Sequence, residues 1–299
     1  MKTRRTKWYM DTFVDIQAVP GRGVTEEAAA GIERAFGAFR KVEQACSRFS
    51  PDSELMTICR LTPAGTPVSV SPLLYEPLQF ALELAEWTGG RFDPSLGGRM
   101  EGLGFNRHYL TGETMRSAVS GSATYRDIVL NGEDRSVTLL QPLVLDLGAV
   151  AKGFAIDLAA RELAGLQGFR INAGGDLYAG GVNEQGRPWE IGIRHPFKQE
   201  STIWEMTLSD QAVCTSGGYE RPSPLQPGTH HLIDPPTGRS PGEWASCSII
   251  APYAMMADAL ATAVFVMGRE GLGLVEEAEA AAVLVTSDGS IVQAGRGLS

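Results

Sequence analysis

A carboxylate and a hydroxyl lie one helical turn apart in an apolar segment near the C-terminal end. The segment reads Tyr253-Ala-Met-Met-Ala-Asp258-Ala-Leu-Ala-Thr262-Ala-Val-Phe-Val-Met, which predicts a buried helix over residues 253–267. Side chains four residues apart share one helix face, so Asp258 and Thr262 can offer two oxygen ligands to a hard cation such as Mg²⁺. The structural alternative is that Asp258 caps the helix and Thr262 bonds back to the backbone.

A second segment has features of an anion-binding site. Asp146-Leu-Gly-Ala-Val-Ala-Lys152-Gly leads from a predicted strand into a predicted helix over about 149–163. A glycine-containing strand-to-helix turn exposes backbone N–H groups at the positive end of a helix, which suits phosphate, and Lys152 adds a positive charge. The spacing is not that of a Walker P-loop, and an ordinary helix start remains the alternative. Asn172-Ala-Gly-Gly-Asp176 is another glycine-rich turn that lets a ligand approach the backbone closely.

Serine, histidine and aspartate also occur close together in the sequence. Ser216 precedes His231-Leu-Ile-Asp234, which is the residue set of a serine hydrolase, but the G-x-S-x-G nucleophile elbow is absent. His231 is open to either a catalytic or a structural interpretation. Phe92-Asp93-Pro94-Ser95 is typical of a turn with the aspartate as its cap.

Composition narrows the class of partner. The net charge of −9 disfavours nucleic acid, because affinity for its backbone comes from clustered Lys and Arg. We expect the basic residues within 1–7 to form a solvated tail. The four cysteines fit no zinc spacing and are expected to be reduced thiols, which suits a cytoplasmic location. No signal peptide is recognised, and no run of about 18 apolar residues predicts a membrane span.

The elements that must position these residues alternate irregularly. We expect a strand over 8–19, a helix that starts at Thr25 and a helix over 72–88. We also expect a hairpin of strands 124–130 and 136–140 around Asn131-Gly132, and a second hairpin over 281–294. Residues 169–251 are expected to be mostly strands and turns. Runs of strands, rather than a regular β-α-β alternation, predict an α+β fold of mostly antiparallel sheets packed with helices. Without repeats or a clear linker, we expect one domain over 1–299.

Taken in order, these segments resemble the ApbE-type family of FAD:protein FMN transferases. The resemblance runs from residue 10 to about 268. It is carried by Met10-Asp-Thr12, Arg48-Phe-Ser-Pro-Asp-Ser-Glu-Leu55, Gly89-Gly-Arg-Phe-Asp-Pro-Ser95, Leu103-Gly-Phe105, Asp146-Leu-Gly-Ala-Val-Ala-Lys-Gly153, Gly174-Gly-Asp176, Thr215-Ser-Gly-Gly-Tyr-Glu-Arg221, His231-Leu-Ile-Asp-Pro-Pro-Thr-Gly238 and Ala257-Asp-Ala-Leu-Ala-Thr262.

The resemblance implies a T-fold-related flavin-binding domain that holds Mg²⁺ at the pyrophosphate of FAD. It implies that Asp258 and Thr262 are metal ligands, assisted by backbone oxygens near Ala149 and Ala261. Residues at positions that contact FAD in the family are Met10, Phe92, Asp93, Asp146, Lys152 and Ile233. A catalytic role for His231 and Asp234 is carried over from the family's His-x-x-Asp-Pro element.

The implied reaction joins FMN to another protein. A Thr or Ser hydroxyl of an acceptor protein attacks the FMN-side phosphorus of FAD, and AMP leaves. His231, oriented by Asp234, would take the hydroxyl proton. The alternative is a relative that binds FAD, or hydrolyses it to FMN and AMP, without labelling protein. The family usually has Gly where Asp11 stands, and the negative charge of Asp11 should weaken FAD binding unless the side chain points away.

Overall fold

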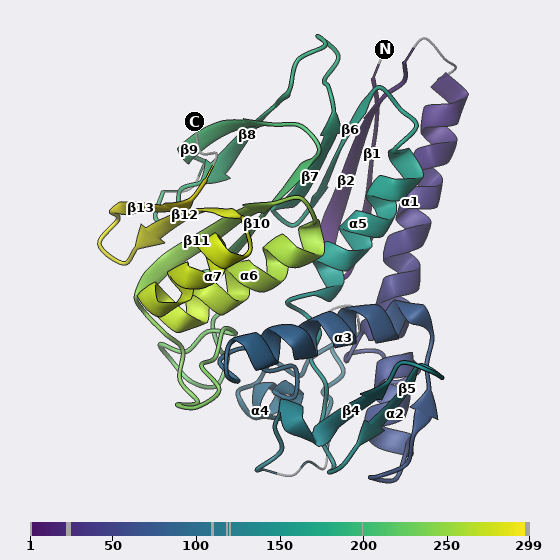
Figure 1. Ribbon diagram of the computed structural model, residues 1–299, viewed down its shortest axis with the longest axis vertical. Coiled ribbons are helices and arrows are strands. Elements are labelled where there is room, and N and C mark those ends of the chain that lie inside the picture. The colour runs from purple at the N-terminus through teal and green to yellow at the C-terminus, as the bar shows by residue number, and fades with distance from the viewer. Residues whose placement is uncertain are drawn as a thin grey trace. The chain divides into compact units, whose positions relative to one another are not determined.

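The chain folds into two compact units, each assembled from segments that are distant in the sequence (Figure 1). The computed structural model describes residues 2–21, 25–108, 111–117, 119, 121–198 and 200–296. The eight-stranded unit comprises Met1–Arg40, Lys152–Tyr219 and Pro241–Ser299, and the three-stranded unit comprises Lys41–Ala151 and Glu220–Ser240. That the two units act as a single domain stays a prediction.

The eight-stranded unit is built on one antiparallel sheet. Its strand order is β1-β2-β6-β7-β10-β11-β12-β13. The strands are β1 (Thr3–Tyr9), β2 (Thr12–Val19), β6 (Gly168–Ala173), β7 (Asp176–Gly181), β10 (Gln211–Gly217), β11 (Trp244–Ala251), β12 (Ala281–Thr286) and β13 (Ile291–Gly295). A separate ribbon of β8 (Trp189–Arg194) and β9 (Thr202–Leu208) packs its apolar side chains against those of β7, β10, β11 and β12.

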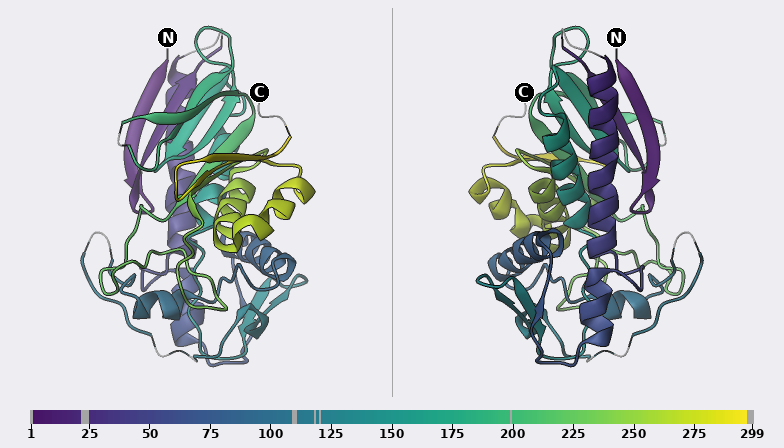
Figure 2. Two further views of the ribbon diagram at one scale, coloured as in Figure 1. Left: turned by 90° about the vertical axis from the view of Figure 1, so that its left-hand side faces the viewer. Right: turned by 90° about the vertical axis from the view of Figure 1, so that its right-hand side faces the viewer.

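Four helices accompany this sheet. They are α1 (Thr25–Cys46), α5 (Ala151–Leu163), α6 (Ala254–Met267) and the short α7 (Leu272–Glu277), with a 3₁₀ turn over Gly268–Gly271 between the last two. The nearly all-apolar α6 packs on β10 and β11, as its composition requires. Helices α1 and α5 run side by side (Figure 2), and an ion pair of 2.8 Å joins Arg34 to Glu162.

The three-stranded unit has a small sheet in the order β3-β5-β4 and short helices. Its strands are β3 (Val68–Ser69), β4 (Ile128–Asn131) and β5 (Ser136–Leu139); its helices are α2 (Glu54–Leu61), α3 (Pro72–Trp87), α4 (Gly97–Gly102) and the 3₁₀ turn Tyr125–Asp127. The Ser53 hydroxyl caps α2 by accepting from the Met56 amide at 3.0 Å. Glu54 in turn accepts from the amide and hydroxyl of Ser71, the residue that precedes α3.

Two expectations for the N-terminus are wrong. Residues 8–19 are not one strand, because Met10 and Asp11 have φ values of 51° and 61° and form a two-residue hairpin turn. Such a turn usually contains Gly or Asn, so Met-Asp gave no signal. The basic run is not a tail either, since Thr3–Tyr9 is an edge strand. Lys7 and Arg5 both pair with Glu33 of α1.

The other elements agree with the sequence analysis. The α+β class with antiparallel sheets is confirmed, as are α1, α3, α5, α6 and the hairpin of β12 and β13. The strand expected over 124–130 is only partly present, because Tyr125–Asp127 forms a 3₁₀ turn before β4 begins. Within the described ranges, every helix is too short or too polar to span a bilayer.

Candidate functional site

Helix α6 carries Asp258 and Thr262 on one face, as the sequence predicts. The helix begins at Ala254 with Tyr253 as N-cap, so Asp258 lies in the second turn and does not cap it. Asp258 is 5% exposed, and its Oδ2 accepts a hydrogen bond of 3.1 Å from the Gly153 amide of α5. The Thr262 hydroxyl is 3.1 Å from the Ser216 hydroxyl on β10. The two side chains therefore present a buried carboxylate and a hydroxyl pair.

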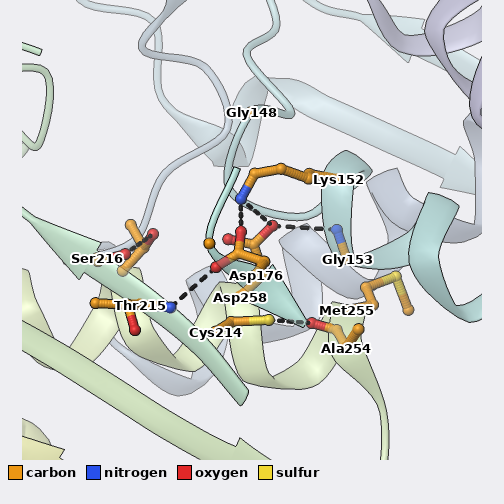
Figure 3. A network of polar contacts seen from close by, with 12 residues as sticks. Gly148, Lys152, Gly153, Asp176, Cys214, Thr215, Ser216, Ala254, Met255 and Asp258 are labelled. Carbon is orange, nitrogen blue, oxygen red and sulfur yellow. Dashed lines mark hydrogen bonds and ion pairs between the residues drawn. The ribbon is translucent and has the colours of Figure 1, made fainter. Parts of the chain in front are cut away.

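The first turn of α5 brings a positive charge to this carboxylate (Figure 3). The Lys152 ammonium forms an ion pair with Asp176 and lies 3.7 Å from Oδ2 of Asp258. Asp176 is 2% exposed, and its Oδ1 accepts from the Thr215 amide at 2.9 Å. Two buried carboxylates would repel each other strongly, so the ammonium stabilises both. The two buried carboxylates therefore favour a positive charge between them.

Two tight turns lie next to each other at one end of the sheet. The Met10-Asp11 turn joins β1 to β2, and Gly174-Gly175 joins β6 to β7, with β2 and β6 paired as neighbours. Gly174 has a φ of 66°, and an added Cβ would lie 2.5 Å from the Thr12 hydroxyl oxygen. Only glycine fits there without displacement. Asp176 is the first residue after the second turn, and its carboxylate pairs there with Lys152, whose ammonium also lies near Asp258.

Asp146 of the three-stranded unit is held as an anion. Its Oδ2 accepts from Nε of Arg48 at 2.7 Å, and its Oδ1 accepts from the Gly148 amide at 2.8 Å. Burial alone would raise the pKa of Asp146, but the Arg48 charge and the Gly148 amide outweigh burial and hold it below its usual value. Arg48 is fixed by a 2.6 Å bond to the Phe105 carbonyl.

Asp93, in the same unit, is a turn residue. Its Oδ1 accepts from the Ser95 amide at 2.8 Å, and its Oδ2 accepts from the Tyr125 amide at 3.2 Å. The turn that the sequence predicted as the structural alternative is therefore present. Phe92 beside it is buried and donates its amide to the Thr88 hydroxyl, while Ile233 is buried at 4% exposure.

His231 and Asp234 share a loop, but they do not form a pair. Asp234 accepts from Arg91 Nε and from the Thr237 hydroxyl, each at 2.8 Å. Among the described residues, the buried Nδ1 of His231 has no hydrogen-bond partner. The pKa of His231 is lowered to about 3, mainly by burial and also by the charges of Arg221 and His230. The expected orientation of His231 by Asp234 is wrong, so the serine-hydrolase alternative also lacks its His–Asp hydrogen bond.

The expected residues are divided between the two units. Lys152, Asp258 and Thr262 come together in the eight-stranded unit, where Ala261 is buried beside Thr262 and Met10 lies in the hairpin turn. The three-stranded unit holds the others, namely Phe92, Asp93, Asp146, Ala149, His231, Ile233 and Asp234.

Two further residues, Asp176 and Ser216, contact Lys152 and Thr262 and were not predicted to lie with them. The signal for Asp176 was its place directly after a Gly-Gly turn, where a lone carboxylate follows an apolar strand. Ser216 was noticed only as a candidate nucleophile. Its partner, Thr262, is 46 residues away in the sequence, and the packing of α6 on β10 brings them together.

The family assignment follows from comparison with known proteins. A family model described as the ApbE family matches residues 10–285. The chain belongs to the ApbE family. The match includes the hairpin turn of Met10, both segments that hold Lys152 and Asp176, and the whole of α6. The matched range therefore contains every residue of the site described above.

Relatives and solved structures agree with this assignment. A Rhodobacter capsulatus protein named FAD:protein FMN transferase is 33% identical over 93% of this chain, which spans only 55% of that relative's length. A protein of the same name from Treponema pallidum is 33% identical, covering 82% of this chain and 73% of its own. A crystal structure of the ApbE protein of Thermotoga maritima superposes with a TM-score of 0.84, at 26% identity, over 98% of this chain and 97% of its own.

Proposed function

We propose that this protein is an FAD:protein FMN transferase. It would attach FMN from FAD covalently to a Thr or Ser hydroxyl of an acceptor protein and release AMP in a Mg²⁺-dependent reaction. The observation that carries the proposal is the buried Asp258 carboxylate beside Lys152 and the Thr262 hydroxyl, within a chain that the ApbE family model matches over 10–285. The names of the relatives point to the same activity.

The donor set on α6 fits Mg²⁺. Mg²⁺ prefers hard oxygen ligands, and Asp258 and Thr262 supply a carboxylate and a hydroxyl from one helix face. The Lys152 ammonium between the carboxylates of Asp176 and Asp258 supports this fit, because it shows that the place accommodates positive charge. We propose the backbone oxygens of Ala149 and Ala261 as further ligands. When bound, Mg²⁺ would neutralise charge that develops on phosphate oxygens.

The remaining residues would bind and orient the substrate FAD. Lys152 would bind the pyrophosphate through its positive charge. The backbone N–H groups at the start of α5, where Lys152 lies, would bind it as well. We propose that Met10, Phe92, Asp93, Asp146 and Ile233 contact FAD. Because Arg48 keeps Asp146 ionised, Asp146 would act there as a hydrogen-bond acceptor.

His231 is the proposed acceptor of the hydroxyl proton. With a pKa lowered to about 3, the imidazole is neutral at working pH and can receive a proton, although a low pKa makes it a weak base. Asp234 would serve catalysis indirectly, by holding the loop through Arg91 and Thr237. The four free cysteines support a proposed cytoplasmic location.

A flavinylation assay tests the proposal. The purified protein is incubated with FAD, Mg²⁺ and a carrier protein that bears a Thr-containing acceptor motif, and the readouts are in-gel flavin fluorescence and the intact mass of the carrier. We expect the carrier to gain one FMN. We expect Asp258→Ala to lower the rate by at least about 100-fold, the scale of losing a positioned ligand. Asp288→Ala, which removes a carboxylate from the turn between β12 and β13, is the matched control and should keep full activity.

Two outcomes would contradict the proposal, the first its transfer step and the second its metal site. Release of AMP without a labelled carrier, repeated with a second acceptor sequence, would indicate FAD hydrolysis. Labelling that is equally fast in Asp258→Ala and Asp288→Ala would show that the α6 carboxylate takes no part.

A further inference from the structure

The N-terminus of α6 is not capped by its own residues. Its N-cap, Tyr253, makes no side-chain cap hydrogen bond. The two amides that open the helix donate instead to a carboxylate from another helix. Ala254 N–H donates to Oδ1 of Asp157 at 2.7 Å, and Met255 N–H donates to Oδ2 at 2.9 Å. Asp157, which lies on α5, therefore uses one oxygen on each of two consecutive amides.

The same two helices are also in backbone contact. A Cβ at Gly153 of α5 would lie 2.3 Å from the Ala254 carbonyl oxygen and 2.6 Å from the Cα of Met255, so only glycine permits this approach. The Cys214 thiol, on β10, lies 3.5 Å from the same carbonyl oxygen. Ala254 is thus held at its amide by Asp157, at its carbonyl by Cys214, and along its backbone by Gly153.

The contact is reciprocal. Gly153, in the first turn of α5, donates its amide to Asp258 of α6, while Asp157, one turn further along α5, accepts from the first turn of α6. Each helix start is bound to a carboxylate of the other helix. A carboxylate near a helix N-terminus is also favoured by the helix dipole. These two contacts therefore fix the position of α6 relative to α5, both along the axis of α6 and around it.

This fixation bears on the proposed metal ligands. Asp258 follows Ala254 by four residues and Thr262 follows Asp258 by four, so all three lie on one face of α6 at successive turns. A helix rises 1.5 Å per residue, so a slide of one residue would move both oxygen ligands by about 1.5 Å relative to Lys152 and Ser216. A displacement of that size is enough to disrupt a coordination site.

We propose that Asp157 is a positioning residue that sets the place of α6 and thereby the metal affinity of Asp258 and Thr262. The inference rests on the proposed function for its metal, but not on transfer activity. Asp157 hydrogen-bonds to neither ligand, although burial and the charge of Asp258 raise the pKa of Asp157; it positions the ligands through the first two amides of the helix. It would therefore change metal affinity without changing the ligands themselves.

Metal binding measures this directly. Mn²⁺ is titrated into the protein with saturating FAD and no acceptor protein, and free Mn²⁺ is followed by its EPR signal. Asp157→Ala should raise the Mn²⁺ dissociation constant by about tenfold, the lower end of the range for residues that orient metal ligands. Asp157→Asn keeps one acceptor oxygen and should recover part of the loss. Glu162→Ala removes another α5 carboxylate, one that pairs with Arg34 of α1, and should leave the constant unchanged.

The variants separate positioning from mere stability. If Asp157→Ala lowers Tm but leaves the Mn²⁺ dissociation constant within twofold of wild type, the carboxylate only stabilises the fold and the inference is wrong. Should Asp157→Ala fail to fold, Asp157→Asn decides: wild-type affinity together with unchanged hydrogen exchange at the amides of Ala254 and Met255 overturns the inference. If Asp258→Ala binds Mn²⁺ as tightly as wild type, the metal site itself is wrong, and the inference falls with it.

Discussion

At the residue scale, the loop histidine shows how burial decides chemistry. His231 lies next to His230 and near Arg221, and a positive charge on either residue opposes a charge on its ring. Burial contributes most to its lowered pKa, and the buried Nδ1 has no hydrogen-bond partner among the described residues. The His-x-x-Asp spacing is visible in the sequence, but it does not show that Asp234 accepts hydrogen bonds from Arg91 and Thr237 instead. The order of residues in a loop does not determine which side chains bond.

The lowered pKa predicts how stability depends on pH. In the folded protein His231 titrates near pH 3, whereas in the unfolded chain it titrates near its ordinary value of about 6.5. Between these values the unfolded state binds more protons, so stability rises with pH over this range and is lost as the pH falls below about 6.5. We expect wild type to lose about 2 kcal/mol more than His231→Gln between pH 7 and pH 5.

Chemical denaturation at both pH values measures the difference. His195→Gln, which removes a histidine from the loop between β8 and β9, is the control. An equal loss of stability in wild type and His231→Gln would show that His231 is not held neutral by burial.

Flavin transfer by His231→Ala, measured in the same series, is expected to fall by about 10²- to 10⁴-fold if the ring accepts the hydroxyl proton.

At the element scale, the hairpin turn between β1 and β2 explains a departure from the family pattern. Asp11 has a φ of 61°, in the left-handed region that glycine adopts freely and that Asp and Asn tolerate better than other side chains. The turn therefore survives the replacement of Gly by Asp, at the expense of a negative charge next to Met10. Trp8 and Phe13 flank the turn, with ring centroids 4.7 Å apart, and help to close it.

Removing that charge should strengthen FAD binding. If Met10 contacts FAD as we propose, the Asp11 carboxylate repels the pyrophosphate through solvent. A repulsion of about 0.5–1 kcal/mol corresponds to a gain of about two- to fivefold in affinity for Asp11→Asn. Asp11→Gly should give a similar gain, because both variants accept the positive φ. Fluorescence quenching of FAD measures the dissociation constant.

A second acidic residue with positive φ provides the control. Glu279 is exposed at the end of α7 with a φ of 51°, and Glu279→Gln removes the same charge from a different turn. Equal FAD affinity in Asp11→Asn and wild type would mean that the carboxylate points away from FAD or that Met10 does not contact it. An equal gain in Glu279→Gln would point to a general effect of net charge.

At the scale of the whole molecule, the sequence predicted the long elements better than their contacts. Helices α1, α3, α5 and α6 were foreseen because apolar residues recur at helical spacing or fill the segment. The strands β1 and β2 were merged because a Met-Asp turn carries no glycine. The Asp258 and Thr262 face was predicted from i and i+4 spacing. Asp176 and Ser216 join it only because β7 pairs with β10 and α6 packs on β10. Such long-range register is not written in any local pattern.

The four cysteines lie at separate places in the chain, and the burial of their thiols predicts low reactivity toward alkylating reagents. All four are free; Cys46, Cys214 and Cys247 are buried and Cys59 is partly buried. Burial raises the pKa of Cys46 and of Cys59 to about 12, and it raises the pKa of Cys214 and Cys247 as well. Since the thiolate is the reactive form, alkylation of the native protein at pH 8 should be at least about 100-fold slower than that of free cysteine. Intact-mass analysis after iodoacetamide treatment should show no early adduct in the native protein and four adducts in the denatured one. A single rapid adduct would contradict this prediction, because it would reveal a thiol that is more accessible than its burial implies. No proposed step of FMN transfer uses a thiol, so we expect the native protein to keep its transfer activity after treatment with thiol reagents.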